Sequence, residues 1–215
     1  MKFTSQIPTV CIIVAHPDDE TLWAGGLILT RPLWQYDIYT LCRASDPDRA
    51  LRFQSALARF NASGGMSDLD DGPDQQPLSV DTIQQTILDH LDDRSYDLII
   101  THSPRGEYTR HRRHEEAWQA IWPLWRRKQI RSKSLWAFAY SDAKGRRKPT
   151  VDTDAHFLLP LDVSVWTEKY RILTEIYGFG ADSWEAQTTP RTEGFWCFDS
   201  VKAVQDWARK RGIDQ

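Results

Sequence analysis

The sequence VCIIVAHPDDE, Val10 to Glu20, joins an apolar run directly to a histidine and three carboxylates. A short apolar run rich in β-branched residues predicts a strand buried on both faces, as in a parallel sheet. Ligands of open α/β sheets bind at the carboxyl ends of such strands. We therefore expect residues 10–15 to form a buried strand and His16 to Glu20 to lie in a functional site.

Working outward from this stretch, strand-like runs alternate with helical patterns. Residues 21–30 predict a buried helix and residues 36–42 a second strand. Asp46 followed by Pro47 is typical of an N-cap with proline at the first helical position, so a helix should follow. We expect a polar loop at 63–77, and then a helix capped by Ser79, a strand at 98–102 and a helix at 112–126.

This order of elements predicts the α/β class, with a Rossmann-like parallel sheet flanked by helices on both faces. Beyond residue 130 the pattern is less regular. It predicts a strand at 134–140, a helix at 163–177, a short extended piece at 195–198 and a final helix capped by Asp199. We expect one domain over 1–215, in which 1–130 form the core and 131–215 a less regular extension that frames the cleft.

The composition is that of an ordinary globular protein, with 40% hydrophobic and 27% charged residues. A net charge of −3 gives no overall attraction to nucleic acid or to an anionic membrane. The three cysteines are widely spaced, which excludes a disulfide framework and suits a reducing compartment. No signal-like or membrane-spanning run is evident, so we expect a cytoplasmic protein. The sequence is compatible with a homo-oligomer.

Two polar clusters follow two of the predicted strands. His16 and Asp19 lie three apart, and their nitrogen and oxygen atoms suit a zinc-like divalent ion. His111 and His114 lie three apart at the start of a helix and therefore share a face. One of them would complete a His–Asp–His set with positions left open for water and substrate. Asp18 would then be free to act as a base. The alternatives are a chance His-x-x-His and a plain helix N-cap at Asp18 or Asp19.

The segment Ala15 to Glu20, followed by Gly25-Gly26, resembles the first motif of the LmbE-like (PIG-L-like) N-acetylglucosaminyl deacetylases. The segment Thr101 to Tyr108, continued through His111 and His114, resembles the second motif of that family. The resemblance covers residues 9–125.

The resemblance implies a role for each matching residue. His16, Asp19 and His114 match the zinc ligands, and Asp18 matches the general base. His111 matches the histidine that steadies the charged intermediate or protonates the leaving amine. Two further residues match substrate-side positions, Tyr108 at the oxyanion and Arg49 in substrate binding.

The second motif departs from the family pattern in two ways. Thr109-Arg110 separate Tyr108 from His111, where many members have a single residue, and this puts the oxyanion role of Tyr108 in question. Arg112-Arg113 replace the usual Pro-Asp, so a carboxylate that would hold a ligand histidine is missing. Glu107 and Glu115 are the candidates to replace it.

The implied activity is a zinc-dependent N-deacetylase, a hydrolase of linear amide C–N bonds that uses zinc or another divalent metal. Its substrate would be a small N-acyl amino sugar or glycoconjugate. Protonated His111 and the metal would stabilise the tetrahedral oxyanion, and Asp18 or His111 would protonate the amine. The late aromatics either stack against a sugar or fill the core; they are Trp166, Tyr170, Trp184 and Trp196.

Two other function classes remain open. The first is a metal-dependent carbohydrate-binding protein without turnover. The second is a nucleic-acid-binding protein that uses the basic stretch 105–131, which has tryptophans between its arginines. Those tryptophans recur at helical spacing, which favours a packed helix and argues against a nucleic-acid partner. The same arginines would also suit an anionic sugar substrate.

Overall fold

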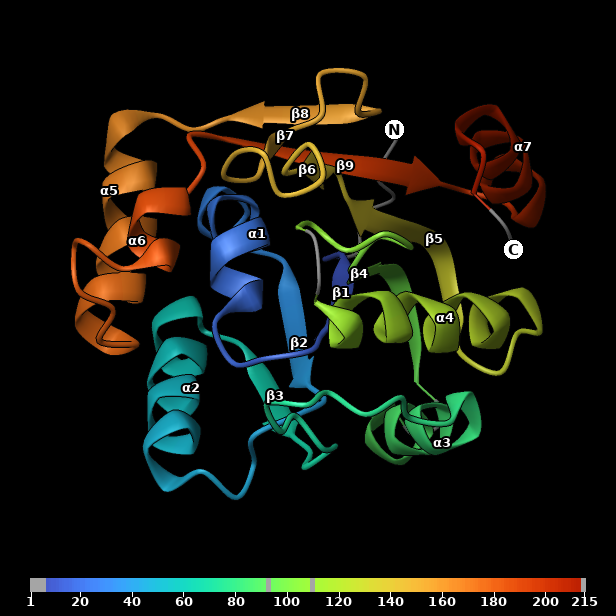
Figure 1. The fold of residues 1–215 in the computed structure, drawn as a ribbon, viewed down its shortest axis with the longest axis horizontal. Coiled ribbons are helices and arrows are strands. Elements are labelled where there is room, and N and C mark those ends of the chain that lie inside the picture. The colour runs from blue at the N-terminus through green and yellow to red at the C-terminus, as the bar shows by residue number, and fades with distance from the viewer. Residues whose placement is uncertain (1–6, 92–93, 109–110, 214–215) are drawn as a thin grey trace.

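A seven-stranded sheet lies at the centre of the molecule in the computed structural model, which describes residues 7–91, 94–108 and 111–213 (Figure 1). The strand order is β3-β2-β1-β4-β5-β9-β8. Strands β1 to β5 are parallel, and β9 runs antiparallel to both β5 and β8. The strands of this sheet are β1 Thr9–Val14, β2 Gln35–Thr40, β3 Ser63–Met66, β4 Ser95–Thr101, β5 Arg131–Phe138, β8 Phe157–Pro160 and β9 Thr192–Phe198. A separate small ribbon pairs β6 Tyr140–Ser141 with β7 Thr150–Val151.

Helices cover both faces of the sheet, which confirms the predicted α/β architecture (Figure 1). One face carries α1 Asp19–Thr30, α2 Pro47–Phe60, α5 Val163–Arg171 with its π-helical continuation Ile172–Ile176, and α6 Trp184–Thr188. The other face carries α3 Val80–Leu91, α4 Arg112–Arg126 and α7 Val201–Arg211. In the part of the chain that the structure describes, no helix combines the length and apolar character that a membrane crossing needs.

The central position of β1 explains why its residues are all apolar instead of alternating between apolar and polar. Cys11 and Ile13 point into the core layer beneath α3 and α4, whereas Val10, Ile12 and Val14 point into the layer beneath α1 and α2. Both faces of the strand are therefore buried, as expected for a central parallel strand. The chain passes from β1 to β2 and β3 on one side, and continues with β4 and β5 on the other. This reversal between β1 and β4 is a topological switch point.

The predicted loop at 63–77 is wrong at its start, because Ser63–Met66 form the edge strand β3 beside β2. The strand was not predicted because glycine, which is uncommon in strands, occupies two of its four positions. A Cβ on Gly64 would lie 1.8 Å from the carbonyl oxygen of Ile38, so only glycine allows the backbones to approach this closely. The final helix also begins differently from the prediction. Its N-cap is Ser200, whose hydroxyl accepts from the N–H of Ala203, and Asp199 lies one residue earlier.

A buried carboxylate on β9 joins the C-terminal part of the chain to α1. Glu193 on β9 accepts from the N–H groups of Gly26 (2.6 Å) and Leu27 (2.7 Å) and forms an ion pair with Lys169 on α5 (2.6 Å). Both charged side chains are fully buried. A Cβ on Gly26 would lie 2.4 Å from Cδ2 of Leu161 and 2.9 Å from a Glu193 carboxylate oxygen. This close approach accounts for the glycine at position 26.

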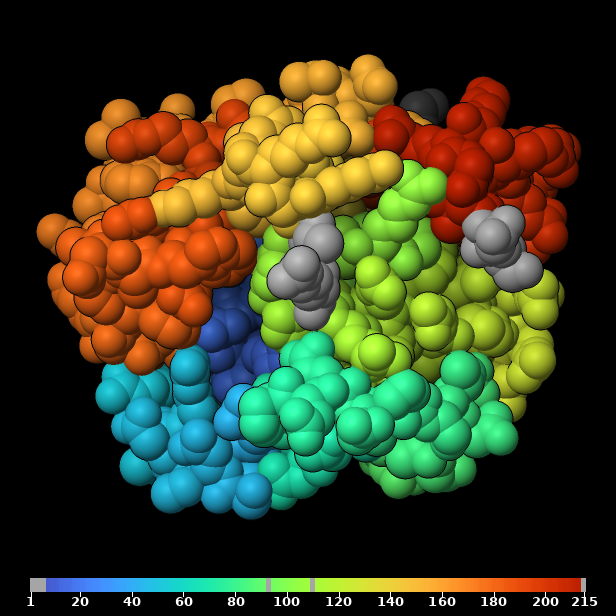
Figure 2. All heavy atoms as spheres, viewed as in Figure 1, coloured from blue at the N-terminus to red at the C-terminus, as the bar shows by residue number. Residues whose placement is uncertain are grey.

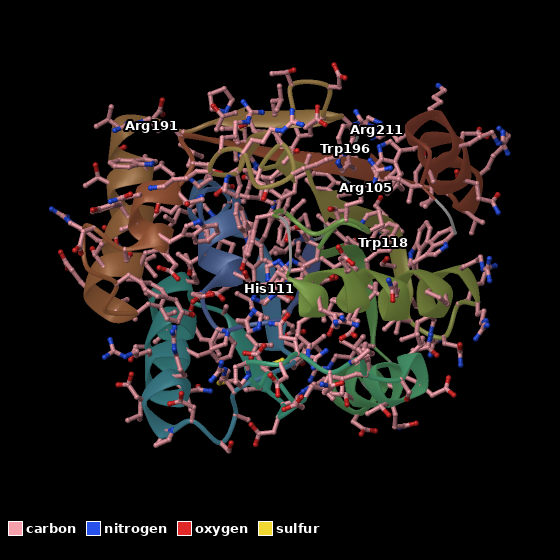
Figure 3. All side chains as sticks on the ribbon, viewed as in Figure 1. Arg105, His111, Trp118, Arg191, Trp196 and Arg211 are labelled. Atoms are coloured by element: carbon pink, nitrogen blue, oxygen red, sulfur yellow. The ribbon has the colours of Figure 1, made fainter. Side chains whose placement is uncertain are left out.

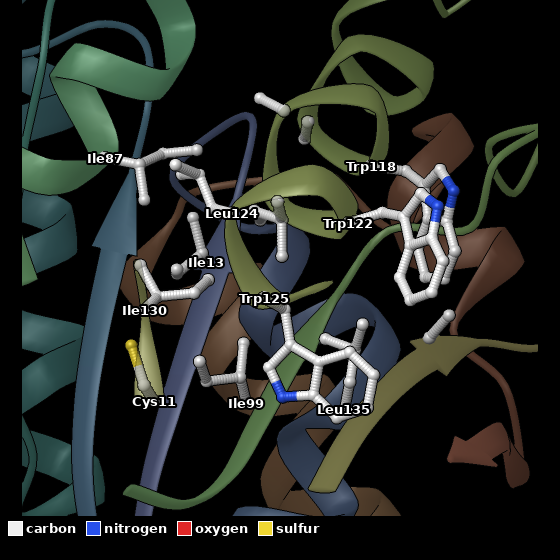
Figure 4. Packing of buried hydrophobic residues seen from close by; sticks show 14 of the residues in the cluster. Cys11, Ile13, Ile87, Ile99, Trp118, Trp122, Leu124, Trp125, Ile130 and Leu135 are labelled. Carbon is white, nitrogen blue, oxygen red and sulfur yellow. The ribbon is translucent and has the colours of Figure 1, made fainter. Parts of the chain in front are cut away.

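The tryptophans of α4 belong to the core. Trp118, Trp122 and Trp125 are all buried. Figure 4 shows the ring of Trp125 beside Leu135 and the rings of Trp118 and Trp122 together further along the helix. Trp118 packs there against Phe198 and Trp207. Rings placed in this way cannot stack against nucleotide bases. These tryptophans are therefore core residues, and they are not available to bind the bases of a nucleic acid.

Candidate active site

A cleft of about 490 Å³ opens at the carboxyl ends of the central strands, beside the switch point between β1 and β4. Figure 2 shows a depression here, where the blue N-terminal segment lies behind the orange and cyan surfaces. The cleft is lined by residues from both halves of the chain: His16, Asp18, Asp19, Arg43, Arg49, Asp71, Tyr108, His111, Trp184 and Glu185 among them. His114 lies fully buried beneath this lining.

The three predicted metal ligands meet at one carboxylate oxygen. Oδ2 of Asp19 lies 3.2 Å from Nδ1 of His16 and 3.3 Å from Nε2 of His114. The other oxygen, Oδ1, accepts from the indole N–H of Trp23 at 3.1 Å. That bond aims Oδ2 at the two imidazoles, as the outer partners of metal ligands commonly do.

Glu107 holds two histidine rings in place beneath this cluster. Its Oε2 accepts from Nδ1 of His114 at 2.6 Å and from Nδ1 of His102 at 2.7 Å, and all three side chains are fully buried. Glu107 thus supplies the carboxylate that the missing Pro-Asp would have provided. Burial raises the pKa of Glu107, but the facing rings of His102 and His114 outweigh this and lower it to about 2.

His102 is a site residue to which the sequence pattern assigned no role. It lies 3.5 Å from Oδ2 of Asp19 and stacks on His114 with ring centroids 3.8 Å apart. The N–H of Ala15 donates to its Nε2 at 2.9 Å, so His102 links the end of β1 to the end of β4. A histidine immediately after the apolar strand 98–101 was the available signal.

The donor set fits a divalent metal. Within the described residues, three imidazole nitrogens are buried without a hydrogen-bond partner: Nε2 of His16, Nδ1 of His111 and Nε2 of His114. One ligand atom from each of these three histidines lies within 4.8 Å of the others, and the same holds for Asp19, His102 and His114. Unpaired buried nitrogens are costly unless a ligand satisfies them. Histidine and carboxylate atoms are the usual ligands of catalytic zinc.

Asp18 stands apart from this set, on the wall of the cleft. Its φ of 137° is rare for a residue with a side chain, and such strain gathers at functional sites. The carboxylate lies 3.2 Å from Nη1 of Arg49, whose guanidinium stacks against the ring of Phe179. Burial and the adjacent Asp19 raise the pKa of Asp18, although His16 and Arg49 oppose this. A raised pKa suits a group that accepts and returns a proton near neutral pH.

His111 lies at the N-cap of α4, in the centre of Figure 3. Its ring packs 4.2 Å from His114, 4.5 Å from His16 and 5.2 Å from Tyr108, measured between centroids. Burial lowers the pKa of His111 to about 2, and the neighbouring His114 and His16 add to this effect. A ring with so low a pKa is neutral at pH 7 in the metal-free chain, whereas the resemblance implies a protonated His111. Thr109 and Arg110, which set the unusual spacing to Tyr108, lie outside the described residues.

A further acid in the cleft comes from the loop after β3, and the sequence did not mark it. Asp71 places Oδ1 3.2 Å from Nε2 of His16, and its Oδ2 receives Nε and Nη2 of Arg43 at 3.0 and 2.7 Å. Burial raises the pKa of Asp71, but His16 and Arg43 outweigh this and hold it below its usual range.

Of the late aromatics, Trp184 reaches the cleft. It stands at the start of α6, and its ring centroid lies 4.6 Å from that of Tyr108. Trp166 and Tyr170 stack on each other beside Arg191, and Trp196 packs against Trp207 and Arg211. Figure 3 shows Arg191 and Trp196 well away from His111. Trp196 belongs to the core, as the packing interpretation predicts, whereas Trp166 and Tyr170 are half-buried and lie outside both core clusters.

Comparison with protein-family models gave no match, and comparison with curated protein sequences gave none either. Solved structures do match. N,N′-diacetylchitobiose deacetylase from Pyrococcus horikoshii aligns with a TM-score of 0.68 and 12% identity, over 89% of this chain and 84% of that one. The zinc-inhibited form of teicoplanin deacetylase Orf2 aligns with a TM-score of 0.58 and 13% identity, over 95% and 93%.

The 4-carboxy-2-hydroxymuconate hydratase GalB from Pseudomonas putida also matches, with a TM-score of 0.54 and 14% identity over 91% of this chain and 98% of that one. The fold is thus shared by enzymes of different reactions. At these identities the likeness establishes the fold. The structural neighbours include deacetylases, and this chain has their fold.

Proposed function

We propose that this chain is a zinc-dependent N-deacetylase that hydrolyses the N-acetyl group of an amino sugar or of a small glycoconjugate. The observation that carries the proposal is the meeting of Nδ1 of His16 and Nε2 of His114 at Oδ2 of Asp19, with a strained carboxylate, Asp18, beside them. Two matching structures are deacetylases, of diacetylchitobiose and of teicoplanin, which supports an acetylated sugar as the substrate class.

His16, Asp19 and His114 are the residues that would hold the zinc. Zinc bound there would lower the pKa of water and polarise the acyl carbonyl. Glu107 keeps Nδ1 of His114 occupied, so Nε2 is the nitrogen that faces the site. Such carboxylate partners orient a ligand histidine and make it more basic.

Asp18 is the base of this scheme. Its carboxylate lines the cleft and accepts the proton of the attacking water. Because burial leaves His111 neutral, Asp18 is also the group that has a proton to return to the departing amine nitrogen. Arg49, paired with Asp18, stands where it can bind the substrate and keep the carboxylate oriented.

The substrate carbonyl would lie between the metal set and His111. A neutral imidazole still carries one N–H, which can donate to the oxygen as negative charge develops on it. The ring of Tyr108 lies beside His111, and its hydroxyl can add a second donor. Trp184, on the adjoining wall, offers an aromatic surface to the sugar ring.

The test is acetate release by the full chain after removal of metal and addition of one equivalent of zinc. N-acetylglucosamine and N,N′-diacetylchitobiose are the probes, and both acetate and free amine are measured. We expect both products in equal amounts with zinc and neither after chelation. Tight binding of the sugars without acetate would favour a carbohydrate-binding protein instead. No acetate from either sugar, together with no binding, would contradict the proposal.

A further inference from the structure

A third group of metal-type ligands shares His16 with the proposed zinc set and adds two residues that have no part in the proposed reaction. It consists of His16, Cys42 and Asp71, and one ligand atom from each lies within 4.8 Å of the other two. His16 follows β1, Cys42 follows β2, and Asp71 comes from the loop after β3. Three adjacent strand ends thus bring together a nitrogen, a sulfur and an oxygen, on the side of His16 that faces away from β4.

The two nitrogens of His16 point to different partners. Nδ1 lies 3.2 Å from Oδ2 of Asp19, whereas Nε2 lies 3.2 Å from Oδ1 of Asp71. Nε2 is buried, and the contact with Asp71 does not have hydrogen-bond geometry. Two ligands bound to one tetrahedral zinc at about 2.0–2.1 Å lie about 3.4 Å apart. The spacing of Nε2 and Oδ1 is therefore that of two ligands of a common ion.

Asp71 and Cys42 are suited to complete such a site. Arg43 occupies Oδ2 of Asp71 and thereby leaves Oδ1 directed at His16. Cys42 is fully buried, and burial raises the pKa of its thiol to about 12. The thiol is therefore inert by itself, and a bound metal would displace its proton to solvent. His16, Arg43 and Asp71 all line the cleft, which gives an ion a route to the sulfur.

We propose that Nε2 of His16, Sγ of Cys42 and Oδ1 of Asp71 form a second metal site, selective for thiophilic divalent ions such as Cd²⁺ or excess Zn²⁺. Thiolate ligands favour these ions over Mg²⁺, Ca²⁺ or Mn²⁺. The site shares His16 with the proposed catalytic set. A neutral imidazole has one nitrogen free for a metal, so an ion held at Nε2 would leave Nδ1 protonated and unable to bind the catalytic zinc. The site would therefore act as a metal-dependent brake on the enzyme. This last step rests on the proposed function; the site itself does not.

Cadmium titration of the full chain tests the site without reference to activity. Bound thiolate gives a sulfur-to-cadmium charge-transfer absorption in the ultraviolet. We expect this band in the wild type and in Cys197→Ser, because Cys197 lies on β9 away from the cleft. We expect no band in Cys42→Ser. A wild type without the band, or a band that survives in Cys42→Ser, would overturn the proposal.

Asp71→Asn provides a second variant in case Cys42→Ser fails to fold. Loss of the carboxylate should weaken cadmium binding more than about tenfold, as judged by the same band. The matched control is Asp74→Asn, which changes an exposed acid of the same loop. Equal cadmium affinity in Asp71→Asn and the wild type would count against the site.

The inhibitory consequence is tested separately, with acetate release measured as zinc is raised beyond one equivalent. We expect excess zinc to lower the rate of the wild type more than that of Cys42→Ser, with each rate expressed relative to the protein's own maximum. Equal inhibition of the two proteins would refute the brake. A chain with no deacetylase activity would refute the proposed function, and the cadmium band would still decide whether the second site exists.

Discussion

At the scale of single residues, Asp18 and Asp19 are neighbours in sequence and yet have different surroundings. Asp19 begins α1, and its carboxylate lies among His16, His102 and His114. Burial raises its pKa, but His114 and His102 outweigh this and hold it well below the usual range. Asp18 has a φ of 137° and a raised pKa. Two carboxyl groups whose environments push their pKa values apart are typical of a division of roles. The roles proposed here are ligand for Asp19 and base for Asp18.

Asp18→Asn tests this division. The amide keeps the size of the side chain but cannot accept the proton of water, so kcat should fall by about 100-fold or more. Zinc content should remain one per chain, because Asp18 is not part of the ligand set. Both quantities are measured on the same preparation, by acetate release and by metal analysis. Loss of zinc together with activity would show that Asp18 is a ligand rather than the base.

Glu107→Gln tests the support of the ligand histidines. Glu107 accepts from both His102 and His114, so an amide in its place would leave one ring without its partner. We expect zinc affinity, measured by competition with a chelator, to fall by about 10–100-fold. Glu115→Gln is the control, since Glu115 lies one residue beyond His114 without a bond to either ring. A similar loss of zinc affinity in both variants would show that the effect comes from the loss of one negative charge and not from the loss of the bonds to His102 and His114.

At the scale of elements, α1 carries the site and is held from behind by the C-terminal part. The buried pair of Lys169 and Glu193 joins α5, β9 and the backbone of α1. A buried ion pair adds little net stability over an apolar pair, but removal of one partner leaves an uncompensated charge. If Lys169 is removed, the carboxylate that remains buried is Glu193. It also accepts hydrogen bonds from two N–H groups of α1, so the helix depends on it as well.

Lys169→Met should therefore lower the free energy of unfolding by about 3–5 kcal/mol, as measured by urea denaturation. The control is Lys133→Met, which removes a 70% exposed lysine from its ion pair with Asp97. Exposed pairs contribute at most about 1 kcal/mol, so this change should be small. Comparable losses in the free energy of unfolding of the two variants would show that burial of the Lys169–Glu193 pair does not make its disruption more costly.

Local sequence patterns were sufficient to predict the elements that depend on short-range signals. The apolar run of β1, the Asp46-Pro47 start of α2 and the limits of α4 all appear in the structure. Strand β3 was missed, because its pairing with β2 depends on a backbone contact at Gly64 that no local pattern reports. Strands β8 and β9 pair antiparallel at the sheet edge, which follows from the path of the chain after residue 138 rather than from periodicity.

At the scale of the whole molecule, the site is assembled from segments that the fold brings together. The convergence of His16, Asp19, His111 and His114 was predictable, because parallel strands place their carboxyl ends at one edge of a sheet. Asp71 was not predictable, since its approach to His16 depends on the course of the loop after β3 and on Arg43. Glu107 was one of two candidates, and only the folded geometry shows which acid reaches the rings.

This assembly links the stability of the metal-free protein to pH. The pKa of Glu107 is about 2 in the folded protein, compared with 4.5 when the group is unperturbed. A carboxyl whose folded pKa is depressed contributes stability that is fully present above the unfolded pKa and is lost as pH falls toward the folded one. Metal-free wild type should therefore lose stability steeply between pH 4.5 and pH 2. Glu107→Gln lacks this group, so its thermal midpoint should be lower at pH 6 but should fall less over the same interval. Parallel curves for the two proteins would show that the charge on Glu107 is not coupled to folding.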